Sequence, residues 1–261
     1  MGFHQAPKPA AHALFLIIAA VSCSCSASAG MVLKADRSLS VSMALSLPQP
    51  VDAWARGMTG AGDKAPLFDP AAVAAGARTR GFTVLESSSP TAGSYRGSFS
   101  VPDLDAFVSA PRPAVPADDT GRRPSPAGSL SSLGILRVER GPGWASLRMR
   151  MDRQNASAIL DLFPGVDRQL LESLMPPAAW DNPVTKAQYR SMLGSLMGKA
   201  AGNAVDAAVF TLSLTLPGPI IESKGGSAGP GTAGRTVSFS MPALDAMTLE
   251  TPAEFYVKWS E

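Results

Sequence analysis

The sequence predicts an α+β fold with a single antiparallel, strongly twisted sheet that is covered by a few helices. Two observations support this fold class. Apolar residues alternate with Ser, Thr or Arg in several separate segments, as expected for strands with one buried and one solvated face. Helical periodicity is confined to a few segments, and the strands before and after each of them alternate in the same way.

The length and charge of the chain limit its class. It has 261 residues, of which 45% are hydrophobic and 17% charged, so it is long enough for one large domain or two small ones. Its 23 Lys and Arg residues against 21 Asp and Glu residues give a net charge of +2. A nucleic-acid-binding protein that relies on phosphate contacts is therefore not expected.

The N-terminus has the features of an export signal. Residues 13–21 are an uninterrupted apolar run, which matches the core of a signal peptide and is shorter than the roughly 20 residues that span a bilayer. Small residues follow directly, as at a cleavage site. We therefore expect a signal peptide over residues 1–22 and an exported mature chain.

Two cleavage positions are compatible with this segment. Residues 20–23 resemble a bacterial lipobox, in which Cys23 is lipidated and becomes the first residue of the mature protein. Cleavage after Ala29 instead gives a soluble periplasmic or secreted protein. Cys23 and Cys25 are the only cysteines and are too close for a useful disulfide, which favours lipidation of Cys23. The predicted location is the bacterial cell envelope, with the membrane as a partner through this N-terminal lipid anchor.

Alternation of period two predicts the strands of the mature chain. The predicted strands are residues 39–47, 95–101, 146–152, 210–216, 236–241 and 255–259. A Gly-Pro-Gly turn at residues 141–143 predicts a hairpin between residues 135–139 and 144–152. The positions expected to face the core include Val41, Met43, Leu45, Phe99, Leu212, Leu214, Phe239 and Val257.

Three helices are predicted. One covers residues 71–80 after an Asp69-Pro70 start, and another covers residues 166–174. The strongest pattern covers residues 185–206, where apolar residues recur every three or four positions and three glycines run alongside. Its methionines and glycines suggest an adaptable surface for an apolar ligand or partner. The residues assigned to that surface are Tyr189, Met192, Leu193, Leu196, Met197 and Gly198.

The remaining segments complete the predicted organisation. After the signal peptide, residues 23–261 are expected to form one α+β domain. Residues 110–133 are rich in Pro, Ser, Gly and Arg and predict a flexible loop within it. Residues 160–206 are expected to be a helical insertion, because the predicted strands on either side share one pattern.

Residue content excludes several kinds of catalysis. Both histidines, His4 and His12, lie in the predicted signal peptide, so the mature chain has none for a Ser-His-Asp site or for a His-ligated metal. The remaining catalytic candidates are the pair Ser195 and Lys199 and two acidic pairs, Asp103 with Asp105 and Asp118 with Asp119, and solvated positions explain all of them better. We expect no catalytic residues, no metal site and no cofactor, and a protein that is not an enzyme.

The order of segments resembles the LppM-like bacterial envelope lipoproteins. A Cys after a signal precedes a long alternating strand, and the chain later reaches an apolar strand, Pro217-Gly218, a second apolar strand and a Gly turn at residue 225. The resemblance covers residues 23–110 and 134–261 and is carried by strand order and this short motif. The helical stretch 160–206 departs from the family pattern. The resemblance implies an envelope-surface or periplasmic module that binds lipid or glycolipid, without catalytic residues.

The function predicted from the sequence is a non-catalytic, lipid-anchored envelope protein. In the first form of this hypothesis it is a lipid- or glycolipid-binding module, with the helix at 185–206 covering an apolar cleft. In the alternative it is a structural or protein-interaction lipoprotein without a small-molecule ligand, recognisable by a solid core and an exposed apolar patch.

Overall fold

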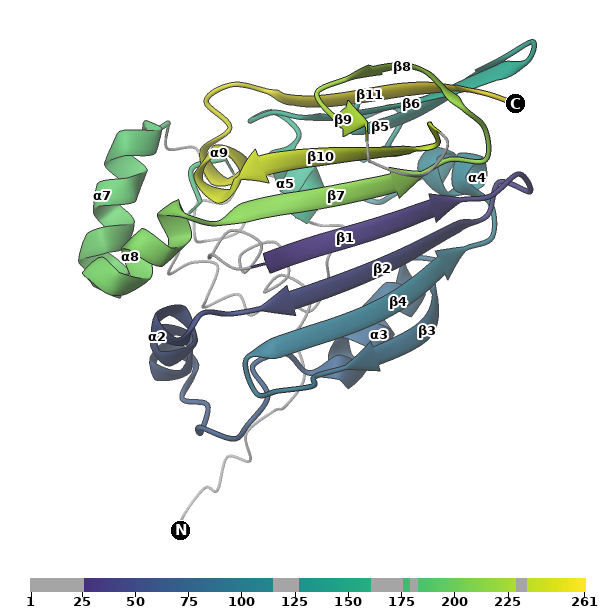
Figure 1. The fold of residues 1–261 in the computed structure, drawn as a ribbon. Helices are drawn as coiled ribbons and strands as arrows, with labels where there is room; N and C mark the ends of the chain where they lie inside the picture. The colour runs from purple at the N-terminus through teal and green to yellow at the C-terminus, as the bar shows by residue number, and fades with distance from the viewer. Residues whose placement is uncertain (1–25, 115–126, 161–175, 179–182, 229–233) are drawn as a thin grey trace.

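The computed structural model describes residues 26–114, 127–160, 176–178, 183–228 and 234–261 (Figure 1). Their strands form two sheets. The larger has seven strands in the order β3-β4-β2-β1-β7-β10-β9, and the smaller has four in the order β5-β6-β11-β8. The strands of the larger sheet are β1 (Ser26–Leu33), β2 (Leu39–Ser46), β3 (Thr83–Ser88), β4 (Ser94–Val101), β7 (Val209–Thr215), β9 (Ser227–Ala228) and β10 (Thr236–Pro242). Those of the smaller sheet are β5 (Leu136–Gly141), β6 (Trp144–Met151), β8 (Ile220–Lys224) and β11 (Ala253–Ser260).

The prediction of a single antiparallel sheet is wrong. Each of the six predicted strands is present, but β6 and β11 pair with each other in the smaller sheet, and β2, β4, β7 and β10 belong to the larger one. The larger sheet is also not fully antiparallel, because β1 pairs in parallel with β7. Alternation fixes which face of a strand is buried, whereas the choice of neighbouring strand depends on long-range contacts that alternation does not encode.

Strand β1 is the largest difference from the sequence-based prediction. Residues 26–33 form a strand between β2 and β7, in the middle of the larger sheet. The sequence analysis assigned residues 27–29 to a possible cleavage site. Ala27 and Ala29 point into the core and are only 2% and 7% exposed.

One continuous cluster of buried apolar residues connects the two sheets. Phe239 of β10 and Phe255 of β11 meet in it, with ring centroids 5.8 Å apart. The core-facing predictions are confirmed for Val41, Leu45, Phe99, Leu212, Leu214, Phe239 and Val257, while Met43 is half-buried against the same cluster.

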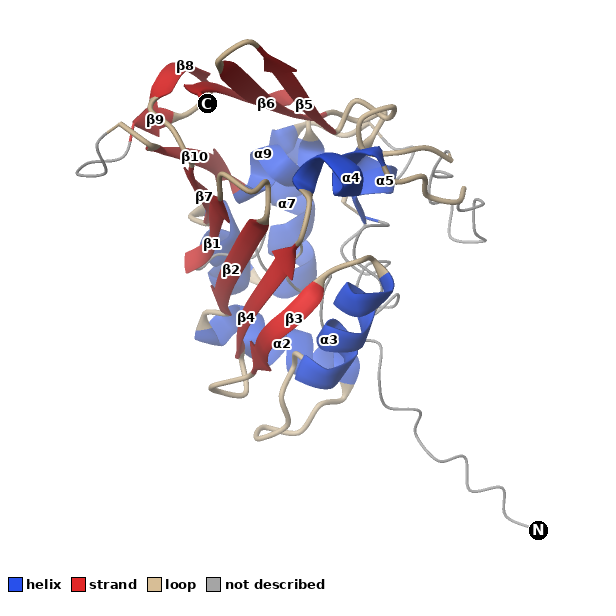
Figure 2. Ribbon diagram, turned by 90° about the vertical axis from the view of Figure 1, so that its right-hand side faces the viewer, coloured by secondary structure: helices blue, strands red, loops and turns tan. Residues whose placement is uncertain are grey.

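The helices lie on one side of the larger sheet and at one end of it (Figures 1 and 2). The described helices are α2 (Gln49–Thr59), α3 (Pro70–Thr79), α4 (Leu104–Ser109), α5 (Ala156–Leu160), α7 (Lys186–Met197), α8 (Lys199–Asp206) and α9 (Ala243–Thr248). Helix α3 begins as predicted, because the Asp69 carboxylate accepts hydrogen bonds from the amides of Ala71 and Ala72. The predicted helix at 166–174 lies outside the described residues, as do residues 115–126 of the predicted 110–133 loop.

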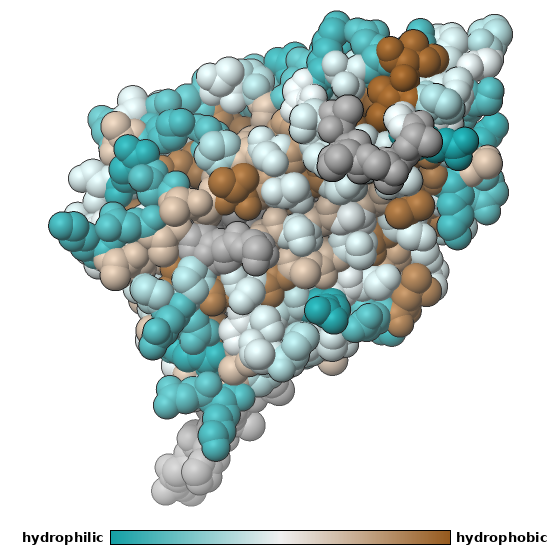
Figure 3. Space-filling view, viewed as in Figure 1, coloured by the Kyte–Doolittle hydropathy of each residue, from teal (hydrophilic) through white to brown (hydrophobic). Residues whose placement is uncertain are grey.

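The opposite face of the larger sheet carries none of the described helices (Figures 1 and 2). Ser and Thr side chains dominate this face. Some of them form hydrogen bonds between neighbouring strands; the hydroxyl oxygens of Thr215 and Thr236, for example, lie 3.0 Å apart. Figure 3 shows the middle of this face in the pale colours of residues near the centre of the hydropathy scale. The polar side of the alternating segments is thus the solvated side of the larger sheet. No helix among the described residues is long and apolar enough to cross a membrane.

Candidate functional site

The segment predicted as one helix over 185–206 consists of two helices that meet at a corner. Helix α7 begins with a reciprocal capping box between Thr185 and Gln188 and ends at Gly198. Gly198 has φ of 82°, in the left-handed region that favours glycine, and α8 starts at the next residue. Gly198 is therefore the turn residue of an α7–α8 corner, which we define as residues 185–206, and it is not part of a packing surface.

The six residues assigned to an apolar surface divide between the core and the solvent. Tyr189, Leu193 and Met197 lie on the inner side of α7, and Tyr189 and Leu193 are 0% and 1% exposed. Met192 and Leu196, one helical turn apart, lie on the outer side and are 36% and 41% exposed. The structure thus brings only Met192 and Leu196 together at the surface.

The inner side of α7 fills the core. A side chain that lines a cleft open to a ligand keeps some accessible surface, and Tyr189 keeps none. Its hydroxyl lies 3.8 Å from the sulfur of Met247 in α9. In this conformation α7 therefore packs directly on its neighbours, without an apolar cleft beneath Tyr189.

The glycines of this segment bring the two helices together. A β carbon placed on Gly202 of α8 would lie 3.0 Å from the Cα of Gly194 in α7, which is closer than ordinary packing allows. A β carbon on Gly194 itself would meet nothing within 4 Å. These two glycines thus serve the close approach of α7 and α8 to each other.

Ion pairs hold the two helices of the corner together and connect the corner to α9. Arg190 of α7 donates to the carboxylate of Asp206, at the end of α8, with its two nitrogens 2.9 and 2.6 Å from the same oxygen. Lys186 pairs with Asp245 of α9. Lys199 at the start of α8 is exposed. The outer side of the corner thus combines two apolar side chains with basic residues.

The corner adjoins the start of β1. Helix α8 ends at Asp206, and β7 begins at Val209, which pairs with Ser26 in the β1–β7 register. Val209 is 43% exposed at this end of the sheet. The predicted lipidation site, Cys23, lies three residues before Ser26 and outside the described residues.

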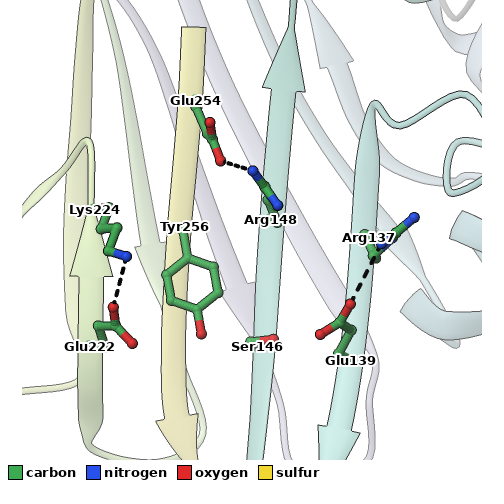
Figure 4. A pocket seen from close by; sticks show the side chains of 8 residues that line it. All are labelled: Arg137, Glu139, Ser146, Arg148, Glu222, Lys224, Glu254 and Tyr256. Atoms are coloured by element: carbon green, nitrogen blue, oxygen red, sulfur yellow. Dashed lines mark ion pairs between the residues drawn. The ribbon is translucent and has the colours of Figure 1, made fainter.

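A second candidate is a charged groove of about 240 Å³ on the outer face of the smaller sheet (Figure 4). It is lined by Arg137, Glu139, Ser146, Arg148, Glu222, Lys224, Glu254 and Tyr256. Its ion pairs are Arg137 with Glu139, Arg148 with Glu254, and Lys224 with Glu222. Each cation thus has a carboxylate partner in the groove, and all of these side chains are at least partly solvated. Such exposed pairs contribute about 0–1 kcal/mol each, so the groove is an ordinary polar sheet surface.

The catalytic candidates Asp103, Asp105 and Ser195 have structural roles, whereas Asp118 and Asp119 lie outside the described residues. Asp103 caps α4 by accepting a hydrogen bond from the amide of Ala106 at 2.9 Å. Asp105 accepts from Arg140 Nε at 2.8 Å, and this bond raises the pKa of the Arg140 guanidinium. Sequence reasoning missed this contact, because the two residues are far apart in the chain. The Ser195 hydroxyl donates to the Ser191 carbonyl within α7. Within the described ranges, no three His, Cys, Asp or Glu residues are grouped as metal ligands would be.

Comparisons with known proteins give one distant structural similarity. No family model matches the chain, and no curated protein matches it. Among solved structures, it is similar to the NMR structure of the folded domain of the Mycobacterium tuberculosis protein LppM, with a TM-score of 0.35 and 13% sequence identity. The similarity covers 90% of this chain and 88% of that one. At this TM-score the similarity does not establish a common family.

Proposed function

We propose that this chain is an exported envelope protein, that a lipid on Cys23 anchors it to a bacterial membrane, and that its folded domain acts as a non-catalytic structural or protein-interaction module. The observation that carries the proposal is the position of β1. This strand begins at Ser26 and lies between two other strands, so the fold requires the chain from Ser26 onward.

The position of β1 supports the lipobox site over the cleavage site after Ala29. Cleavage after Ala29 would remove residues 26–29, which pair with residues 209–212 of β7. It would also remove the buried side chains of Ala27 and Ala29 from the middle of the sheet. The apolar run of the signal ends at residue 21, so a cut that removes the signal and keeps β1 falls between residues 21 and 26. Cys23 lies in this window, and a lipobox cleavage before it leaves β1 intact.

The described contacts favour a structural or protein-interaction role over a lipid-filled cleft. The inner side of α7 is packed against the core, and the acidic pair Asp103 and Asp105 serves as a helix cap and an ion-pair partner. The exposed features of the described residues include Met192 and Leu196 on α7 and the Ser- and Thr-rich face of the larger sheet. These are surface features, suited to contacts with another surface rather than to enclosing a small ligand.

Cell fractionation with a labelled fatty acid tests this proposal. The full chain, expressed in a bacterium that processes lipoproteins, is expected to incorporate the label and to remain with the membranes. Cys23→Ser should lose the label and leave the membrane fraction, while the matched control Cys25→Ser should behave like the parent. A parent protein that is unlabelled and soluble would overturn the proposal.

A further inference from the structure

We propose that the outer side of the α7–α8 corner lies against the bilayer that holds the lipid anchor, with Met192 and Leu196 in the membrane interface. This inference rests on the lipidation of Cys23 proposed above. It adds an orientation of the folded domain, in which the end of the larger sheet where β1 begins faces the membrane.

The length of chain before β1 limits the distance between domain and membrane. Ser26 is the third residue after Cys23, and a fully extended chain covers at most about 3.6 Å per residue, so the chain between them spans about 11 Å at most. A lipid on Cys23 therefore keeps the start of β1 close to the membrane surface. The opposite end of the sheet, where β1 ends at Leu33, is farther away by the length of the strand.

The α7–α8 corner lies at the tethered end. In Figure 1, α2, α7 and α8 lie beyond the end of the larger sheet at which the strands β1 and β7 begin. Ser26 pairs with Val209, and Val209 is three residues from the end of α8 at Asp206. Arg190 binds Asp206 directly and thereby holds α7 at the same place.

Exposed apolar side chains gather near this end. Among the described residues, the exposed large apolar side chains are Val32, Leu85, Met192, Leu196, Val209 and Ile221. Three of these six, Met192, Leu196 and Val209, fall between residues 192 and 209, in the corner and at the adjoining start of β7. Met192 and Leu196 are spaced by one helical turn and so project from the same side of α7.

The corner offers an exposed cation to an anionic lipid surface. Of the basic residues in α7 and α8, Arg190 pairs with Asp206 and Lys186 pairs with Asp245 of α9, while Lys199 at the start of α8 is exposed. A helix with exposed apolar residues flanked by Lys and Arg is typical of segments that lie in the membrane interface, where anionic headgroups attract the basic side chains. Because the covalent lipid already holds the protein at the membrane, the contribution of the corner is to fix its orientation.

Depth measurements at single labelled cysteines test this orientation. The full-length lipoprotein carrying Cys25→Ser has no other free thiol, since lipidation occupies the sulfur of Cys23. An environment-sensitive fluorophore is attached at Leu196→Cys and, as matched controls, at Ile221→Cys and Leu85→Cys, which replace exposed apolar residues on β8 and β3. Each protein is reconstituted into vesicles of phosphatidylethanolamine and phosphatidylglycerol with nitroxide-labelled lipid.

The label at Leu196 is expected to shift its emission to shorter wavelength and to be quenched several-fold more strongly than the labels at Ile221 and Leu85. Replacing phosphatidylglycerol by a neutral lipid should weaken this quenching. A protein that floats with the vesicles but shows equal quenching at all three positions would overturn the proposed orientation without contradicting the lipid anchor. A parent protein that fails to float with the vesicles would overturn the anchor and the orientation together.

Discussion

Ala29 of β1 lies opposite Leu212 of β7 in a parallel pair and opposite Met43 of β2 in an antiparallel pair. A residue held between two strands in this way is part of the folded protein, and the chain around it cannot be removed without opening the sheet. The pairing of Ala29 with two strands therefore makes the stability of the fold depend on where the N-terminal signal is cleaved.

A chain that begins at Gly30 is expected to be much less stable than one that begins at Ser26. The shorter chain loses the pairing of residues 26–29 on β7 and leaves β2 partly unpaired. At about 1 kcal/mol for each lost backbone hydrogen bond, the difference is on the order of 4 kcal/mol. Urea unfolding of the two soluble chains measures it, and equal midpoints would show that the first half of β1 is dispensable.

The two sides of α7 are expected to respond differently to the same substitution. Leu193→Ala removes a fully buried side chain and should destabilise the protein by about 2–5 kcal/mol. Leu196→Ala removes a side chain that is 41% exposed on the same helix and should change stability by less than about 0.5 kcal/mol. Chemical denaturation of both variants gives the comparison. Similar losses in the two would show that Leu196 also belongs to the core.

Glycine substitutions in the α7–α8 corner should separate backbone conformation from packing. Gly198→Ala places a β carbon in open space but in the left-handed region, so it should cost about 1–2 kcal/mol. Gly194→Ala, in the interior of α7 and also without contacts, should stabilise by about 0.5–1 kcal/mol. Thermal unfolding measures both. A single continuous helix over 185–206 would instead make both substitutions stabilising.

This corner also illustrates what the sequence could and could not predict. The stripe from Tyr189 to Met197 was recognisable because helical spacing places those side chains on neighbouring positions. The break at Gly198 was not predicted, since a glycine inside a helical pattern is often tolerated and its φ depends on where α8 packs. The division of the stripe into a buried and an exposed side likewise depends on neighbours such as Met247 in α9.

Strand β1 was not predicted from the sequence, for a different reason. Its first residues are small, so Ala27 and Ala29 produce little hydrophobic contrast with Ser28 and Gly30. Small residues are also typical of a signal-peptidase site. By contrast, β2 and β10 were found because Val41, Leu45 and Phe239 alternate clearly with serines. The division of the strands between two sheets follows from pairings such as β6 with β11, which join residues about a hundred positions apart.

Tyr95 should make the protein less stable at alkaline pH. Burial raises the pKa of its hydroxyl from 10.0 to about 12, a shift that the hydrogen bond with Ser87 opposes. The unfolded chain therefore releases this proton at a lower pH than the folded protein. The stability that Tyr95 contributes is present below pH 10 and is lost as the pH rises through about 12. Urea unfolding at pH values on either side of 10 should show that the free energy of unfolding falls more steeply with rising pH for the parent than for Tyr95→Phe. The same pH dependence in both proteins would contradict a raised pKa for the buried Tyr95 hydroxyl.

The intact mass of the mature protein tests the central claim most directly. The full chain is exported in a bacterium that processes lipoproteins, purified from the membrane fraction with detergent, and analysed by mass spectrometry. We expect a polypeptide that begins at Cys23 and carries the added mass of a diacylglyceryl group. A mature protein that begins at Gly30, without lipid and with the first half of β1 removed, would contradict it.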